Sequence, residues 1–194
     1  MVAGEITKNY CTLAPGHPWH GPYHESEYGF PVNSEIALFE RLCLEINQAG
    51  LSWLTVLKKR QAFRDAFMGF EPRAVAAFGA RDVKRLMADE GIIRNRLKIE
   101  STIDNAGRVL RLADEHGSFA AWIAAHHPRD KDGWIKLFRA TFRFMGPEIV
   151  NEFLMSIGYL SGAHNRDCPV FARIAKLDPP WMGRAAKRAS RQRT

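Results

Sequence analysis

Residues 34–67, SEIALFERLCLEINQAGLSWLTVLKKRQAFRDAF, decide the fold class of this chain. Apolar residues recur in this stretch at spacings of three and four, which is the period of one face of an α-helix. The pattern begins twice, after Ser34 and after Ser52, and serine is a preferred residue at the N-cap of a helix. Gly50 interrupts the pattern between them. The stretch therefore predicts two amphipathic helices joined by a short turn.

The helical period continues along the rest of the chain. The further helices that it predicts are one from Pro72, one capped by Asp82, and amphipathic runs over about 95–115, 133–141 and 147–158. Residues 142–146 separate the last two as a short turn, which gives a helix-hairpin-helix pattern. Sustained alternation of apolar and polar residues, typical of strands, is not found. The predicted fold class is all-α.

Length and composition indicate an ordinary globular protein. The 194 residues are 46% hydrophobic and 25% charged, which excludes a disordered or low-complexity chain. A chain of this length is expected to fold as a single domain with its own core. Apolar stretches long enough to cross a membrane, and a secretion signal, are not found. We therefore expect a cytoplasmic protein that is not bound to a membrane.

The charge balance suggests a polyanionic partner. The formal net charge is +7. Five basic residues, however, lie within the last eleven residues of the chain, where no acidic residue accompanies them. A solvated basic tail would produce the same total, so a helical interaction domain with a basic tail remains an alternative.

Four residues near the two ends of the chain could bind a metal ion. His164 and Cys168 have a spacing that can direct both side chains to one ion, whereas Cys11 and His24 need a loop to bring them together. Two thiolates and two imidazoles would complete a tetrahedral structural zinc site that clamps the N-terminal segment onto the C-terminal region. Alternatively, each could be an ordinary surface or core residue. The three cysteines are too few for a disulfide framework and favour a reducing compartment.

Glu45 is a carboxylate within an otherwise apolar helical pattern. Gln48 and Trp53 follow it around the predicted turn, and Tyr23 and Tyr28 lie in the loop predicted before the helix. A carboxylate beside aromatic rings suits a pocket for a flat cationic heterocycle, because the rings stack while the carboxylate accepts N–H groups. The alternative is that Glu45 occupies an exposed position of its helix.

Several motifs together resemble the DNA-3-methyladenine glycosylase I family of helix-hairpin-helix glycosylases. The motifs are Cys11, YHESEYG (23–29), LE (44–45), QAGLSW (48–53), VLKKR (56–60), GIIRNR (91–96), FMG (144–146), His164 and Cys168. They occur in order over most of residues 11–168, most densely from 23 to 67. We therefore expect a glycosylase domain at 11–178, an N-terminal extension at 1–10 and a basic tail at 179–194 that is disordered.

The resemblance implies a monomeric enzyme that flips 3-methyladenine out of double-stranded alkylated DNA and hydrolyses its N-glycosidic bond, leaving an abasic site. It implies that Glu45 is the catalytic, base-contacting carboxylate. The residues implied to bind the base are Tyr23, Tyr28, Gln48 and Trp53. Gly50 and Leu51 are implied to fill the gap left in the duplex. A structural zinc ion is implied on Cys11, His24, His164 and Cys168.

The chain departs from the family pattern around the implied pocket. Leu13, His20 and Tyr28 stand where the family often has tryptophan or tyrosine, and Ile46 and Asn47 follow Glu45 in place of a small residue and glutamine. A non-catalytic, zinc-clamped helical protein that binds DNA lesions is therefore a second hypothesis.

Overall fold

The computed structural model describes residues 10–183. Within this range every regular element is a helix, which confirms the all-α prediction. The chain forms two compact units. The contiguous unit comprises Asn33–Val150, and the terminal unit comprises the described residues of Met1–Val32 and of Asn151–Thr194. In the described range, no helix combines the length and the apolar character that a membrane span requires. Of the predicted extension and basic tail, residues 1–9 and 184–194 lie outside the described residues.

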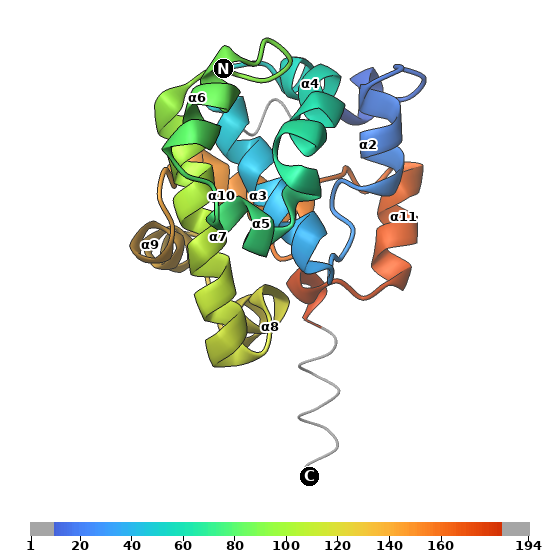
Figure 1. The fold of residues 1–194 in the computed structure, drawn as a ribbon. Coiled ribbons are helices and arrows are strands. Elements are labelled where there is room, and N and C mark those ends of the chain that lie inside the picture. The colour runs from blue at the N-terminus through green and yellow to red at the C-terminus, as the bar shows by residue number, and fades with distance from the viewer. Residues whose placement is uncertain (1–9, 184–194) are drawn as a thin grey trace. The chain divides into compact units, whose positions relative to one another are not determined.

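The contiguous unit contains most of the helices (Figure 1). They are α3 (Glu35–Gln48), α4 (Trp53–Ala66), η1 (Met68–Phe70), α5 (Pro72–Ala76), α6 (Ala80–Ala88), α7 (Arg96–His116), α8 (Phe119–Ala125), α9 (Lys131–Thr141) and the start of α10 (Pro147–Ser156). The long helix α7 packs against α3, α5, α6 and α8. Phe39, Phe63, Phe67 and Phe70 are at most 1% exposed and form part of the core. The stripe of apolar residues read from 34–67 therefore faces the interior.

Polar caps fix where the main helices begin. Ser34 Oγ accepts a hydrogen bond from the backbone N–H of Ala37 at 3.3 Å, and Ser52 Oγ accepts one from Thr55 at 3.2 Å. Both side chains satisfy N–H groups that have no partner within the helix. The predicted helix starts at Ser34 and Ser52 are confirmed.

The prediction that Asp82 caps a helix was wrong by one turn. Helix α6 begins at Ala80, and Gly79 is its N-cap. The Asp82 carboxylate lies in the first turn and accepts a hydrogen bond from the backbone N–H of Gly79 at 3.1 Å. An acidic residue at the third helical position performs this reciprocal role in a capping box, so the sequence signal marked the first turn and not its cap.

A buried ion-pair cluster fastens α4 to α3. The Glu40 side chain is 7% exposed and accepts hydrogen bonds from Arg60 at 2.9 and 3.3 Å and from Arg64 at 2.7 and 3.0 Å. Burial alone would raise the pKa of Glu40, but the hydrogen bonds and charges of both arginines outweigh it and hold this pKa below its ordinary value. Glu40 therefore contributes stability as an anion.

Glu40→Gln is expected to lower the free energy of unfolding at pH 7 by about 2–3 kcal/mol, because the half-buried guanidinium of Arg60 loses its counter-ion while the exposed part of Arg64 is screened. The stability that the ionised carboxylate contributes is present above the ordinary glutamate pKa of 4.5 and is lost as the pH falls through the lowered native pKa. Urea denaturation of both proteins at pH 7 and pH 3 tests this. A difference that stays constant down to pH 3 would contradict it.

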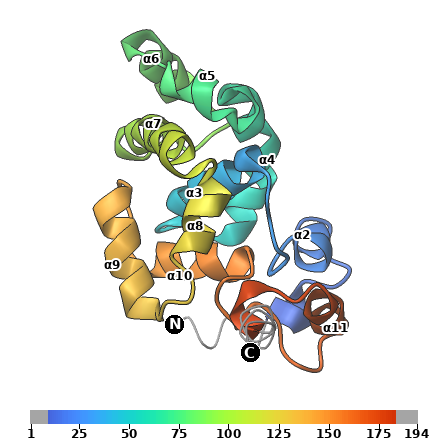
Figure 2. The same cartoon turned by 90° about the horizontal axis from the view of Figure 1, so that it is seen from below.

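The terminal unit contains α2 (His20–Ser26), α11 (Pro169–Lys176), η2 (Pro180–Met182) and the end of α10. Helices α2 and α11 are neighbours in both views of the ribbon (Figures 1 and 2), and Arg173 of α11 donates a hydrogen bond to the carbonyl oxygen of Glu25 at 2.9 Å. The prediction of a loop around Tyr23 and His24 was therefore wrong, because both residues are helical. Their side chains are buried, so packing stabilises a helix that Gly21 and Pro22 disfavour in isolation.

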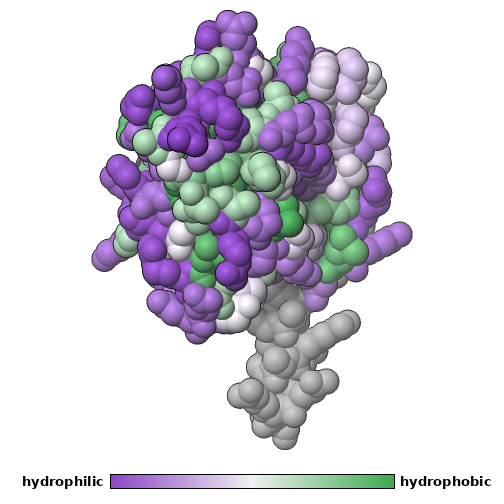
Figure 3. Space-filling view, in the orientation of Figure 1, coloured by the Kyte–Doolittle hydropathy of each residue, from purple (hydrophilic) through white to green (hydrophobic). Residues whose placement is uncertain are grey.

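A small number of large hydrophobic side chains remain exposed. They are Leu13, Trp19, Ile36, Leu51, Met68, Leu97 and Leu177. In the space-filling view, hydrophilic side chains predominate around the rim of the face shown, and hydrophobic ones gather nearer its middle (Figure 3). Isolated exposed apolar residues are normal on a protein surface. Two of these residues also stand out in the sequence: Leu51 as an implied wedge residue and Leu13 as a departure from the family pattern.

Candidate functional site

The four candidate metal ligands meet in the terminal unit. One ligand atom from each of Cys11, His24, His164 and Cys168 lies within 4.8 Å of all the others. Cys168 Sγ is 3.6 Å from His164 Nδ1 and 3.7 Å from His24 Nε2, and Cys11 Sγ is 3.7 Å from His164 Nδ1. Ligands about 2.0–2.3 Å from a tetrahedral ion stand roughly 3.3–3.8 Å apart, so these separations fit one metal ion.

The surroundings of the cluster orient its ligands. His164 Nε2 lies 2.8 Å from the carbonyl oxygen of Tyr28, and this nitrogen must be the donor because a carbonyl only accepts. The proton on Nε2 leaves the lone pair of Nδ1 directed at the two thiols. The backbone N–H of Asn165 points at Cys11 Sγ at 3.5 Å, as expected for a group that stabilises a thiolate.

Burial disfavours charge in the cluster, on the imidazoles and on the thiols alike. Desolvation lowers the pKa of His164 to about 4, so its imidazole is neutral at pH 7 and available as a ligand. Desolvation raises the pKa of the Cys11 thiol to about 11. His24 is 1% exposed, and its Nδ1 has no hydrogen-bond partner among the described residues. Two thiols and two neutral imidazoles assembled out of water form a donor set that could hold a metal ion.

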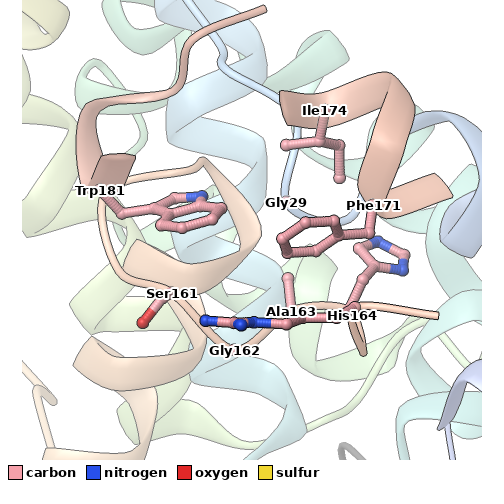
Figure 4. A pocket seen from close by; sticks show the side chains of 9 residues that line it. Gly29, Ser161, Gly162, Ala163, His164, Phe171, Ile174 and Trp181 are labelled. Carbon is pink, nitrogen blue, oxygen red and sulfur yellow. The ribbon is translucent and has the colours of Figure 1, made fainter. Parts of the chain in front are cut away.

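A cavity of about 300 Å³ lies beside His164, one of the four candidate metal ligands (Figure 4). Phe171 and Trp181 line it with their ring centroids 5.9 Å apart, and Ile174 and the metal-cluster residue His164 also contribute to its wall. None of the residues predicted to bind a base lines this cavity. It is therefore distinct from the base pocket that the sequence predicts.

Two of the predicted base-binding aromatics, Tyr23 and Tyr28, belong to the terminal unit. They are 2% and 6% exposed, and their ring centroids are 5.6 Å apart with an angle of 31° between the planes. The Tyr28 hydroxyl donates a hydrogen bond to Glu152 at 3.0 Å. Because the Tyr28 carbonyl also accepts from His164, this residue contacts one of the four candidate metal ligands directly.

Glu45 lies on α3 in the contiguous unit and is 4% exposed. The alternative that it occupies an exposed helix position was therefore wrong. Glu40 is five residues earlier on the same helix, and five residues turn an α-helix by about 140° beyond a full circle. The two buried carboxylates thus occupy different sides of α3. Glu40 binds the arginines of α4, whereas Glu45 is the buried carboxylate that the family resemblance implies as the base-contacting residue.

The turn between α3 and α4 carries the remaining predicted residues. Gln48 ends α3, and its carbonyl oxygen accepts the backbone N–H of Leu51 at 2.7 Å. Gly50 has a φ of +80°, and a Cβ placed on it would meet no atom within 4 Å. Glycine is needed here for its backbone conformation and not for space. Leu51 is 42% exposed, and Trp53 is the first residue of α4.

Lys98 was missed by the reading of the sequence. It is 4% exposed although lysine is seldom buried, and its ammonium group donates hydrogen bonds to the carbonyl oxygens of Asn47 at 2.9 Å and Ala49 at 2.6 Å. The feature of the sequence that could have indicated a buried lysine is its place between the apolar residues Leu97 and Ile99 in an amphipathic helix. The backbone partner, about fifty residues earlier, could not be read from that pattern.

Comparison with known proteins is consistent across sequence and structure. Residues 14–134 match the family model described as methyladenine glycosylase. The chain is 35% identical over 170 residues to DNA-3-methyladenine glycosylase 1 of Escherichia coli strain K12, covering 78% of this chain and 91% of that protein. It is 34% identical over 177 residues to DNA-3-methyladenine glycosylase of Haemophilus influenzae, covering 78% and 95%.

Solved structures that resemble this chain carry the same enzyme name as these relatives. A variant of 3-methyladenine DNA glycosylase I in complex with 3-methyladenine has a TM-score of 0.75 and 33% identity, with 84% of this chain and 97% of that chain covered. The enzyme from Staphylococcus aureus, solved to explain 3-methyladenine recognition, also has a TM-score of 0.75, with 32% identity and coverage of 84% and 96%. This chain therefore belongs to the methyladenine glycosylase family of DNA repair enzymes.

Proposed function

We propose that this protein removes 3-methyladenine from alkylated double-stranded DNA by hydrolysing the N-glycosidic bond, which leaves an abasic site for base excision repair. Support comes from relatives in two bacteria that carry this activity in their names and from a related structure in complex with the free base. One copy of the chain supplies every residue that the proposal uses, so a monomer suffices.

The observation that carries the proposal is the burial of Glu45 on α3. Methylation at N3 places positive charge on adenine, so the base is already a good leaving group and needs no protonation. A desolvated carboxylate attracts such a cation more strongly than one in water. Normal adenine is neutral and presents a different pattern of N–H groups, which would leave the Glu45 acceptor unsatisfied in the pocket. In this proposal Glu45 selects the damaged base and stabilises its departure.

The other proposed contacts fall into two groups. Tyr23, Tyr28, Gln48 and Trp53 are each proposed to contact the flipped base, the aromatic rings by stacking on its faces. Gly50 and Leu51 are proposed to enter the gap left in the duplex, and the exposure of Leu51 supports this because a wedge must reach the DNA. The helix-hairpin-helix segment of α9, residues 142–146 and α10 is proposed to bind phosphate through backbone N–H groups.

We propose that the cluster of Cys11, His24, His164 and Cys168 holds a structural zinc ion. All four coordination positions would be taken by protein ligands, so the ion would supply folding energy and would take no part in base removal. The two ends of the terminal unit, which carry α2 and α11, would be held together by it.

Release of free 3-methyladenine from methylated duplex DNA, resolved by chromatography, tests the proposed function. We expect the purified protein to release 3-methyladenine in a time-dependent reaction. The positive charge of the methylated base and the buried carboxylate of Glu45 together weaken the bond between the base and the sugar. Unmethylated DNA is the control and should release no adenine. Binding to methylated DNA without release of any base would reject glycosylase activity and favour the lesion-binding hypothesis.

A further inference from the structure

Lys98 of α7 is placed to hold the turn between α3 and α4. Its two hydrogen bonds go to the carbonyl oxygens of Asn47 and Ala49, at the C-terminal end of α3. The last carbonyl groups of a helix have no partner within it and carry partial negative charge. Gln48 O, between them, already accepts from the backbone of Leu51. The ammonium group therefore completes the hydrogen bonding at the base of the turn.

The same helix also holds the turn before α10. Asn105, seven residues after Lys98, is fully buried; its side-chain oxygen accepts from the backbone N–H of Arg143 at 2.8 Å, and its amide donates to the Arg143 carbonyl at 3.1 Å. Seven residues are close to two full helical turns, so Lys98 and Asn105 lie on one side of α7. The ring of Phe144, whose φ is +61°, lies 5.9 Å from the Lys98 ammonium.

These contacts connect two segments that the proposed function assigns to DNA. The turn that carries Gly50 and Leu51 is tied to α7 by Lys98, and the turn over residues 142–146 is tied to the same helix by Asn105. A wedge works only if its backbone is fixed relative to the groups that grip the phosphates, because a misplaced group loses much of its effect on the barrier. Burial of the lysine supports this, since a cation is seldom desolvated unless it is well bound.

We propose that Lys98 is a positioning residue for base flipping. It holds the α3–α4 turn in a fixed position relative to the 142–146 turn. This proposal rests on the proposed glycosylase function. Lys98 touches the turn and not the base. Its loss should therefore slow the release of 3-methyladenine from duplex DNA without weakening the pocket for the free base.

The test compares wild type, Lys98→Met and the matched control Arg85→Met. Arg85 of α6 likewise caps the end of a neighbouring helix, donating hydrogen bonds to the carbonyl oxygen of Ala66 at 3.1 and 3.2 Å, but this end of α4 carries no proposed DNA contact. Three quantities are measured: the single-turnover rate of 3-methyladenine release from methylated duplex, the affinity for undamaged duplex, and the binding of free 3-methyladenine by tryptophan fluorescence.

For K98M we expect release to slow by roughly 10- to 100-fold, the range that misplacement of a group near a reacting centre produces, while the affinity for free base and for undamaged duplex stays at the wild-type level. R85M should release base at the wild-type rate. A structural defect alone would reduce free-base binding and release in the same proportion and would overturn the proposal. Release by K98M at the wild-type rate would also overturn it.

If K98M does not fold, Lys98→Gln replaces it, since the amide keeps two N–H donors on a shorter side chain. K98Q should show the same slower release with intact free-base binding, and a wild-type rate would reject the role of Lys98. The wild-type sample distinguishes a failure of the proposed glycosylase function from a failure of the role proposed for Lys98. An inactive wild-type protein rejects the glycosylase function and this inference together, whereas active wild type with equally active variants rejects the inference alone.

Discussion

Glu45→Gln is expected to reduce release of 3-methyladenine from methylated DNA by at least roughly 100-fold, the scale of losing one preorganised electrostatic contact at a reacting centre. Glutamine has nearly the same shape, so the packing of α3 is kept. It lacks the negative charge that attracts the methylated base, and it presents N–H groups where an acceptor is needed. Single-turnover release, with the liberated base resolved by chromatography, measures the effect.

The matched control is Glu40→Gln, the same substitution of a buried carboxylate on the same helix. Glu40 faces the arginines of α4, so this variant should lose stability yet release base at the wild-type rate while it is folded. Equal rates for E45Q and wild type would remove Glu45 from the mechanism. If wild type and E45Q both bind methylated DNA and neither releases a base, the protein is the non-catalytic lesion-binding protein of the second hypothesis.

Cys168→Ser is expected to eliminate metal binding and to destabilise the protein more than any other substitution considered. A tetrahedral site with one ligand removed binds zinc far more weakly, and for a structural site the binding free energy is folding free energy. A loss of at least about 3 kcal/mol would lower the melting temperature of a chain this long by roughly 6–12 °C. Elemental analysis of the purified protein and thermal denaturation measure the two effects.

Cys43→Ser provides the control for metal content. Cys43 is fully buried in α3 of the contiguous unit and is not one of the four clustered ligands, so this variant should retain as much zinc as wild type. Zinc retained by C168S at the wild-type level would contradict the proposed ligand set. An unmutated protein purified without any bound metal, and not stabilised when zinc is added, would contradict the proposed zinc site itself.

The local signals in the sequence predicted the helices of the contiguous unit best. Ser34 and Ser52 act through hydrogen bonds to residues three positions away, so their pattern can be read without knowledge of the fold. Helices α2, α8 and α11 were not predicted. Each has eight residues or fewer, and such short helices depend on tertiary packing that a single sequence does not display.

In the candidate sites, too, features set by local spacing could be predicted, whereas contacts between distant residues could not. The spacing of His164 and Cys168 is local, and it indicated a shared metal ion. Addition of Cys11 and His24 to this pair stood beside the alternative of ordinary surface or core residues until the family resemblance favoured a four-ligand site. The structure brings all four together. The partners of Glu40 and of Lys98 lie twenty to fifty residues away, so neither the ion-pair cluster nor the tie to the α3–α4 turn could be inferred from periodicity. The roles of Tyr23, Tyr28, Gln48, Gly50, Leu51 and Trp53 at the DNA stay predictions.

The order of folding during synthesis follows from the division of the chain into two units. The contiguous unit is complete once Val150 has left the ribosome. The N-terminal part of the terminal unit is made first, yet His24 must wait for Cys168, 144 residues later, before the metal cluster can close. At about 5–20 residues per second this delay lasts roughly 7–30 seconds. During that interval Cys11 and His24 lack their C-terminal partners, so the Cys11 thiol of the nascent chain is open to oxidation.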